Sequence, residues 1–367
     1  MNDSKYKTLL DTLRKEILGG KYKTGQPYPS VRALERRFGI PRSTIGHALD
    51  ELFHQGLISR KQGRGTFVTR TANSRQIGLI VPGVAYSEFF PPIVNEISRL
   101  TQKEGYTLFF GAISSSDPAV RAQQAKAFAK KLIGDGVAGV IYQPLEFVSD
   151  LTERNREIVE LFDRAKIPVV LICADFVRPP DRSEHDVVGV NNVEAGVQMA
   201  RHLLAAGARR IGFLMQTNRG TSIRSRYRGI LLALADCDRR GCSCKLLSAE
   251  PDDLNALKRL LRRWRPDAFV CGSDSDAVKF KATLEKAGLR VPDEVMLAGF
   301  NDVQIASILT PSLTSVRIPC GEIAATAFYR LLARVAHPGL PAMECLLPVR
   351  LIARDSTVRR KRRPRKG

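Results

Sequence analysis

Arg42, Ser43 and Thr44 stand together at the start of a predicted helix, and all three side chains suit contacts with nucleic acid. An arginine can donate two hydrogen bonds to guanine O6 and N7, and serine and threonine are short enough to reach a phosphate or a base edge. A second basic group lies at the tip of a predicted hairpin, where residues 61–65 read Lys-Gln-Gly-Arg-Gly. This pattern predicts contact with double-stranded DNA.

The elements that must position these residues are three helices and a two-stranded ribbon. Apolar residues repeat at helical spacing over 6–17, 31–38 and 45–52, and Gly39 separates the second helix from the third. Two helices joined by such a turn are typical of a helix-turn-helix, whose second helix presents its first residues to base edges in the major groove. A small helical domain with a solvated, charged surface is the alternative interpretation of the same pattern.

The charge of the chain is concentrated at its two ends. Its 367 residues hold 58 Lys and Arg against 37 Asp and Glu, which gives a net charge of +21. Residues 1–70 carry +8 and residues 356–367 carry +7, so the 285 residues between them carry only +6. A basic excess of this size indicates a polyanionic partner for the two ends, around a nearly neutral body.

Hydrophobicity and cysteine content exclude several classes of protein. No apolar run approaches the roughly 18 residues needed to span a bilayer, and the first ten residues lack the apolar core of a signal peptide. Seven cysteines, an odd number spread thinly along the chain, argue against a disulfide framework. We therefore expect a cytoplasmic protein with no membrane partner.

From residue 76 onward, short apolar runs alternate with helix-length amphipathic stretches. These runs occupy 77–81, 106–112, 137–142 and 167–173, and they restart at 211–215, 268–272 and 295–300. Continuous apolar strands that alternate with helices predict parallel sheets covered on both faces, hence an α/β fold. The two series predict two lobes. We expect a winged helix-turn-helix domain over 1–69, a linker over 70–75, a two-lobed domain over 76–355 and a basic disordered tail over 356–367.

Several motifs in the first domain match one known family. They are Pro29-Ser30 before the second helix, Arg32 within it, the opening Arg42-Ser43-Thr44, and residues 62–68 of the hairpin. Together they make residues 29–68 closely resemble the winged-helix domain of the GntR family of bacterial regulators.

The resemblance implies roles for particular residues in binding operator DNA. Arg42 is expected on a guanine and Arg32 on a phosphate or base. The remaining contacts are expected from Ser43, Thr44, Gly63 and Arg64, at the DNA backbone and at the hairpin, which is the wing of this fold. Many members have a second basic residue on the recognition helix where this chain has Gly46 followed by His47, so His47 is the candidate at that position.

Residues 188–214 and 266–317 resemble the effector domain of the lactose/galactose-repressor family, which shares its fold with periplasmic sugar-binding proteins. The resemblance implies a small sugar-like effector, a monosaccharide or a phosphosugar, bound between the lobes at the carboxyl ends of the strands. The candidate contacts at those ends are Tyr86, Phe89, Gln143, Cys173, Asp274 and Asn301. Arg226 is added because it stands three residues before Gly229, where the family has its ligand-binding arginine.

This chain departs from the pattern of that family at three positions. The family usually has Asn-Asp where this chain has Ser273-Asp274, an Asp where it has Asn301, and a polar residue where it has Cys173. A polar pocket is therefore expected, without an identified sugar.

The features combine into a homodimeric transcription regulator, a repressor that leaves its operator when the effector binds. Within the regulator class, a design in which the ligand strengthens DNA binding stays open. A solute-binding protein that does not bind DNA is the alternative from another class, but the lack of a signal peptide and the predicted DNA-binding domain argue against it. A fusion to an aminotransferase-like domain holding pyridoxal phosphate does not fit the rhythm of strands and helices. No catalytic residue, metal site or cofactor is predicted. Cys237, Cys242 and Cys244 lack partners at zinc spacing, and the five histidines have no nucleophile pattern around them.

Overall fold

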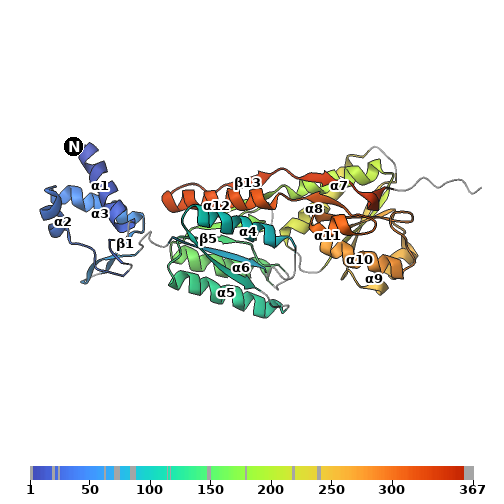
Figure 1. The fold of residues 1–367 in the computed structure, drawn as a ribbon, viewed down its shortest axis with the longest axis horizontal. Coiled ribbons are helices and arrows are strands. Elements are labelled where there is room, and N and C mark those ends of the chain that lie inside the picture. Colours follow the sequence, from blue (N-terminus) through green and yellow to red (C-terminus); the bar gives the residue numbers. More distant parts are fainter. Residues whose placement is uncertain are drawn as a thin grey trace, which may run out of the picture.

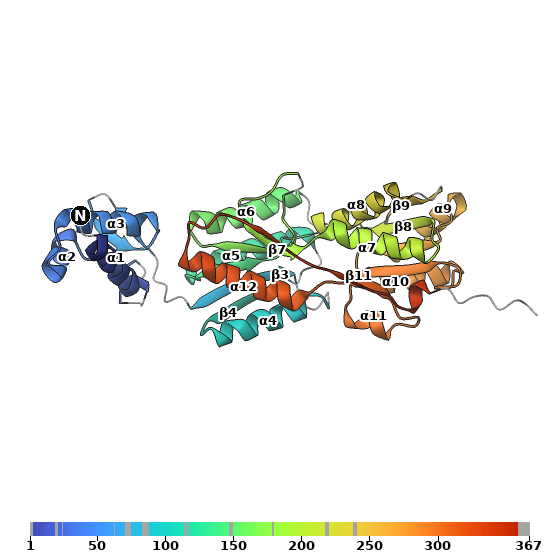
Figure 2. The same ribbon diagram turned by 90° about the horizontal axis from the view of Figure 1, so that it is seen from above.

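The computed structural model describes residues 3–18, 21–23, 25–61, 63–69, 75–82, 88–113, 115, 117–146, 150–177, 180–216, 220–237 and 241–358 (Figure 1). Within these residues the chain forms a small helical domain and two α/β lobes that lie side by side (Figures 1 and 2). The predicted α/β class, with parallel sheets flanked by helices, is confirmed. None of the described helices has the length and apolar character that crossing a membrane requires.

The helical domain contains the elements that the sequence predicts. They are α1 (Asp3–Leu18), α2 (Val31–Phe38), α3 (Arg42–His54), β1 (Ile58–Lys61) and β2 (Gly65–Val68). Ser30 caps α2, because its hydroxyl accepts a hydrogen bond from the backbone N–H of Ala33 at 3.3 Å. Gly39 ends the same helix in the left-handed conformation, with φ at 63°, which favours glycine. Ser30 therefore sets the start of α2, and Gly39 sets the turn between α2 and α3.

The first lobe is built on a six-stranded sheet with the order β13-β7-β6-β5-β3-β4. Its strands are β3 (Gln76–Pro82), β4 (Thr107–Ile113), β5 (Gly139–Tyr142), β6 (Val169–Cys173), β7 (Asp186–Val190) and β13 (Glu344–Leu347). Its helices are α4 (Phe90–Lys103), α5 (Pro118–Gly134), α6 (Leu151–Arg164) and α12 (Cys320–Ala336). All five pairings are parallel, and the sheet is covered on both faces (Figure 2).

The second lobe has the strand order β14-β12-β11-β10-β8-β9. Its strands are β8 (Arg210–Met215), β9 (Ser243–Ser248), β10 (Ala268–Cys271), β11 (Met296–Asn301), β12 (Thr314–Arg317) and β14 (Arg350–Ile352). Its helices are α7 (Asn192–Ala205), α8 (Thr221–Ala235), α9 (Leu254–Arg263), α10 (Asp274–Lys286) and α11 (Gln304–Ile308). Only the pairing of β12 with β14 is antiparallel.

Neither lobe is built from one continuous stretch of the chain, although the order of the apolar runs suggested that each would be. Within the described residues, the chain crosses from one lobe to the other after β7, between β12 and α12, and between β13 and β14. Helix α12 returns to pack on α4, β5 and β6 of the first lobe. A local hydrophobic pattern carries no information about such returns, because they are decided by contacts between distant segments.

The C-terminal boundary also differs from the prediction. Residues 356–358, which the sequence assigned to the tail, belong to the second lobe through the 3₁₀ helix η2 (Asp355–Thr357). Ser356 is buried, and its hydroxyl donates to the backbone carbonyl of Leu297 at 2.6 Å while accepting from the backbone N–H of Thr314. Residues 359–367 of the predicted tail and 70–74 of the predicted linker lie outside the described residues.

Candidate functional site

The first candidate surface is formed by α2, α3 and the wing between β1 and β2. Of the residues predicted to contact DNA, Thr44 is half-buried and the others are exposed: Arg32, Arg42, Ser43, His47, Gly63 and Arg64. At the wing tip, Gly63 and Gly65 have φ values of 72° and 96°, which favour glycine there. The structure therefore leaves the predicted set open to solvent.

Arg42 lies at the first position of α3 and pairs with α2. Its Nε donates to Glu35 Oε2 at 2.6 Å, and both side chains are solvent-exposed to a large degree. An exposed pair of this kind contributes little to stability, about 0–1 kcal/mol. The guanidinium can therefore exchange the carboxylate for a base edge or a phosphate at small cost.

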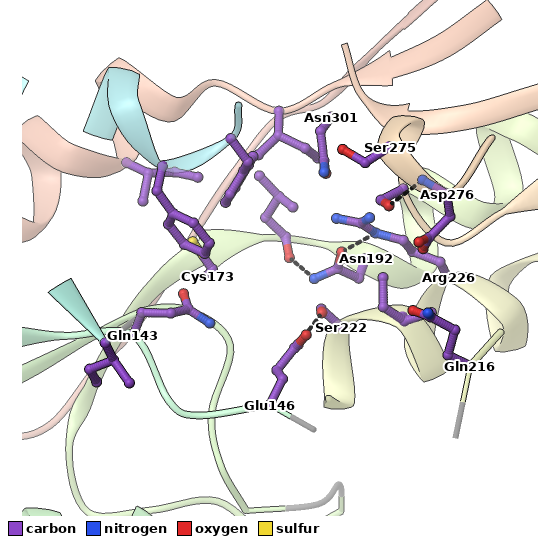
Figure 3. A pocket seen from close by; sticks show the side chains of 18 of the residues that line it. Gln143, Glu146, Cys173, Asn192, Gln216, Ser222, Arg226, Ser275, Asp276 and Asn301 are labelled. Carbon is purple, nitrogen blue, oxygen red and sulfur yellow. Dashed lines mark hydrogen bonds between the residues drawn. The ribbon is translucent and has the colours of Figure 1, made fainter. Parts of the chain in front are cut away.

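The second candidate site is a cavity of about 310 Å³ between the two lobes, at the carboxyl ends of their strands (Figure 3). Gln143 and Glu146 reach it from the first lobe, and Arg226, Ser275 and Asp276 reach it from the second (Figure 3). Parallel α/β sheets place ligands at this edge, because the loops that follow the strands converge there.

Arg226 is held in place within the wall of this cavity. The side chain lies on α8 and is 5% exposed. Its Nε donates to Asn192 Oδ1 at 2.9 Å, its Nη1 donates to the carbonyl of Gly272 at 2.8 Å, and its guanidinium lies 4.7 Å from the centroid of the Phe300 ring. The planar fork is therefore preorganised before any ligand arrives.

Two amide side chains present oxygen atoms that are buried and have no hydrogen-bond partner in the described structure. They are Oε1 of Gln143, which follows β5, and Oδ1 of Asn301, which ends β11. Gln143 Nε2 donates to the carbonyl of Pro144 at 3.3 Å, so its oxygen is the atom left for another donor. Buried polar atoms are nearly always paired, and both of these residues, one from each lobe, line the cavity.

Backbone strain is found at the same strand ends. Cys173, at the end of β6, has a φ of 69°, and Asn301 has a φ of 107°. Non-glycine residues in this region cost about 1–3 kcal/mol and cluster at functional sites. Burial raises the pKa of the Cys173 thiol far above its usual range, so the thiol stays neutral and is at most a weak hydrogen-bond donor.

Phe89 and Phe90 form an apolar part of the wall. Their rings meet edge to face, with centroids 5.2 Å apart and an angle of 80° between the planes. Both residues line the cavity where the chain enters α4. An aromatic surface of this kind suits the apolar face of a sugar ring, and the amides and the guanidinium suit its hydroxyls.

The lobes touch each other on both sides of the cavity. Ser222 Oγ donates to Glu146 Oε1 at 3.4 Å, and the backbone N–H of Ile305 donates to Glu88 Oε2 at 3.2 Å. A Cβ atom at Gly220 would lie 2.1 Å from Glu146 Oε1, so a side chain there would displace the Glu146 carboxylate from its present position. The structure is therefore that of a closed cleft.

Five of the seven predicted ligand residues line this one cavity. They are Phe89, Gln143, Cys173, Arg226 and Asn301. Tyr86 lies outside the described residues.

Asp274 is the exception, because the structure does not bring it to the cavity. Its side chain is 0% exposed, and it accepts hydrogen bonds from Ser315 Oγ at 2.7 Å and from the backbone N–H of Val303 at 3.1 Å. Burial raises the pKa of Asp274 to about 7. Ser273 caps α10, so the first carboxylate of the helix turns toward β12, and Asp276 lines the cavity instead.

Several charged and polar residues of the wall were not indicated by the sequence patterns. Arg121 and Lys279 come from helices, and Asn192 follows β7, a strand that the apolar runs did not identify. Glu146 lies three residues after Gln143, and its place beyond a predicted strand end was the available signal. Three cationic side chains and two carboxylates thus line the cavity, and they leave it close to neutral.

Both domains match known families. Residues 5–68 match the model for bacterial regulatory proteins of the gntR family, and residues 200–357 match the model for a periplasmic binding protein-like domain. The chain is therefore a DNA-binding transcriptional regulator with a GntR-type helix-turn-helix and a periplasmic-binding-protein-like domain, as the two resemblances predicted.

Comparison with individual proteins extends this result over the whole chain. The arabinose metabolism transcriptional repressor of Geobacillus stearothermophilus is 25% identical over 366 residues, which cover 96% of this chain and 97% of that protein. The crystal structure of transcription regulator GntR from Chromobacterium violaceum is 27% identical, with a TM-score of 0.59 over 77% of this chain and 99% of that one.

A third relative shows the fold. A LacI family transcriptional regulator from Enterococcus faecium, solved with bound ribose, is 21% identical, with a TM-score of 0.62 over 78% of this chain and 100% of that chain. These relatives are regulators and not enzymes, in agreement with the prediction.

Proposed function

We propose that this regulator is a repressor that binds a two-fold operator as a homodimer and is released when a monosaccharide fills the cavity between the lobes. The observation that carries the proposal is the pair of unpartnered acceptors, Gln143 Oε1 and Asn301 Oδ1, beside the fixed guanidinium of Arg226. In this proposal, the hydroxyls of a sugar donate hydrogen bonds to the Gln143 and Asn301 oxygens and accept a hydrogen bond from Arg226.

The size of the cavity favours a single sugar ring. Small-molecule sites span roughly 300–1,000 Å³, and a cavity of about 310 Å³ lies at the lower end. The names of the relatives add arabinose and ribose as first candidates, so a pentose is the proposed class. Phe89 forms the apolar wall of the proposed site, and Cys173 lies at its edge.

At the other end of the protein, Arg42 is proposed to bind a guanine, with Arg32, Ser43 and Thr44 on the backbone or neighbouring bases. His47 and the wing residues Gly63 and Arg64 complete the surface. A dimer would place two such surfaces on two half-sites related by the same symmetry. The site of action is proposed to be the cytoplasm, where the DNA target is found.

Coupling between the two sites follows from how the cavity is built. Its walls come from both lobes, so a ligand stabilises the closed arrangement of the lobes. The DNA-binding domain precedes β3 of the first lobe. A change in lobe arrangement within a dimer would therefore alter the distance between the two DNA-binding domains. Ligand weakens operator binding by the same factor as operator weakens ligand binding.

A thermal-shift screen with pentoses, hexoses and their phosphates tests the ligand class. A ligand that binds only the folded state raises the melting temperature, because it stabilises the fold. At a ligand concentration a hundred times the Kd, the free energy of unfolding increases by about 2.7 kcal/mol. A shift with arabinose or ribose supports the proposal. Shifts with phosphosugars alone would assign the site to an anionic ligand. An operator affinity that rises when ligand is added would show that the ligand strengthens DNA binding and does not release the repressor.

A further inference from the structure

A second basic surface lies on the second lobe and has no role in the proposed function. Five of the eight residues 258–265 are Lys or Arg, none is acidic, and all five cations are exposed. With Lys245 of β9, which is also exposed, they form what we call the α9 basic face: Lys245, Lys258, Arg259, Arg262, Arg263 and Arg265. None of these six forms an ion pair within the described part of the chain.

The absence of acidic partners on this helix contrasts with α6 of the first lobe. On α6, Arg156 pairs with Glu153 and Arg164 pairs with Glu160, at the spacings that stabilise helices. On α9, the cations instead stand four residues from one another, Lys258 from Arg262 for example, and like charges at this spacing repel. Arg262 and Arg263 gain from their place in the last turn, where the helix dipole favours cations. Lys258, one turn earlier, has no such compensation.

The α9 basic face lies at the end of the second lobe that faces away from the cleft. Arg265 lies three residues before the start of β10, and Val358, the last described residue, follows η2, which is hydrogen-bonded to the start of β11. Since β10 and β11 are parallel neighbours, Val358 lies at the same end of the sheet as Arg265. Residues 359–367, which follow Val358 in the sequence, include seven Lys and Arg. The DNA-binding domain instead joins the first lobe at the start of β3, so the two basic regions lie at opposite ends of the molecule (Figures 1 and 2).

We infer that the α9 basic face is a second contact for duplex DNA, made to phosphates and independent of sequence. Unpaired cations on an exposed helix suit a phosphate backbone, because such contacts need charge but no base recognition. Duplex DNA is the polyanion that the protein already holds through its first domain. A neighbouring stretch of the same DNA is therefore present at high effective concentration. One regulator would then hold two segments of DNA, one at each end.

Trp264 provides a direct probe of this contact. It is the one tryptophan of the chain and lies between Arg263 and Arg265, with the Lys245 ammonium 5.3 Å from its ring centroid. The full-length protein is first saturated with an operator duplex obtained by binding-site selection. A second duplex without an operator is then added while tryptophan fluorescence is recorded. A saturable change in emission is expected for the wild type.

The test variant is K258Q/R259Q/R262Q/R263Q. Glutamine has nearly the same helix propensity as lysine and arginine, so this exposed helix should keep its structure, which the melting temperature checks. The matched control is K130Q/R154Q/R156Q/R164Q, which removes four exposed charges from the first lobe. Each phosphate contact contributes about 0.9 to the slope of log affinity against log salt concentration. The α9 variant should lose about 3.5 of that slope for the second duplex, and the control should lose much less.

Three results would overturn the inference. In the first, the α9 variant and the control bind the second duplex equally. In the second, a labelled non-operator duplex is not retained by wild-type protein bound to an immobilised operator. In the third, a single-stranded RNA binds the α9 basic face more tightly than duplex DNA, which would assign the surface to a different partner. Loss of retention in the α9 variant alone supports the assignment.

Discussion

Replacing Gln143 by leucine separates a binding role from a structural one. Gln143 is 5% exposed, and its Oε1 has no partner in the described structure. An unpaired buried acceptor costs about 1–3 kcal/mol, whereas the bond from Nε2 to Pro144 is long, at 3.3 Å, and contributes about 0.5 kcal/mol. Leucine has a similar size and no polar atom. The ligand-free Gln143→Leu protein should therefore be as stable as the wild type, or more stable by about 1 kcal/mol.

The affinity of Gln143→Leu for the sugar should fall, although the stability of the ligand-free protein does not. A sugar hydroxyl that donates to Gln143 Oε1 would face a methyl group in the variant and lose its partner in a desolvated pocket. That loss costs about 1–3 kcal/mol, or about 5- to 150-fold in Kd. Urea unfolding gives the stability of the ligand-free protein, and calorimetric titration with arabinose or ribose gives the affinity.

Gln76 offers a matched control, because its Oε1 is also buried and has no hydrogen-bond partner among the residues that the structure describes. It lies at the start of β3, and the cavity lies beyond the other end of that strand. Gln76→Leu should change stability in the same direction and leave sugar affinity unchanged. The reasoning is refuted if Gln143→Leu loses more than about 2 kcal/mol of stability and binds the sugar normally.

The remaining predictions concern the other sites. Arg226→Ala should abolish the response to sugar and also lower the melting temperature by several degrees, since one buried and one partly buried acceptor lose their donor; a variant with wild-type thermal stability would contradict this. Arg42→Ala should lose about 1–3 kcal/mol on the operator and relax preference at one base position, with fold stability nearly unchanged; an unaltered preference in a binding-site selection would exclude the guanine contact. Burial raises the pKa of Asp274 from 3.8 to about 7, so the folded protein keeps a proton there that the unfolded chain releases, and stability should fall as pH rises from about 4 to 7. Asp274→Asn should flatten that dependence in urea unfolding at pH 5 and 8, and an unchanged slope would show that the carboxyl is ionised in the fold. Deleting residues 359–367 should reduce the salt dependence of DNA binding and leave operator preference intact; an identical salt slope would remove the tail from the interface.

The first domain was predictable from its sequence because its signals are local. Ser30 caps the helix that begins at Val31, Gly39 ends it, and the glycines of the wing adopt the positive φ that their spacing suggests. Each of these features depends on a few neighbouring residues. The same is true of the central strands of both lobes, whose residues are apolar throughout because both faces of the sheets are covered.

Edge strands and crossovers were not predictable in the same way. In β9, Leu246 is exposed while Leu247 is buried, and β13 alternates in burial, so neither strand forms a continuous apolar run. The return of α12 to the first lobe depends on its packing against α4, which lies more than two hundred residues earlier in the chain. The position of Asp274 at a strand end was evident, but the direction of its carboxylate depends on Ser315, a residue of a strand that the sequence did not reveal.

The central claim is that occupancy of the cavity between the lobes controls binding of DNA by the first domain. Its most direct test is the affinity of the full-length protein for a selected operator duplex, measured by fluorescence anisotropy with and without a sugar that raises the melting temperature. At saturating sugar, we expect the wild type to lose at least about tenfold in operator affinity. In Gln143→Leu, the same loss should require a higher sugar concentration. An operator affinity that stays constant while the sugar saturates the cavity would contradict the account.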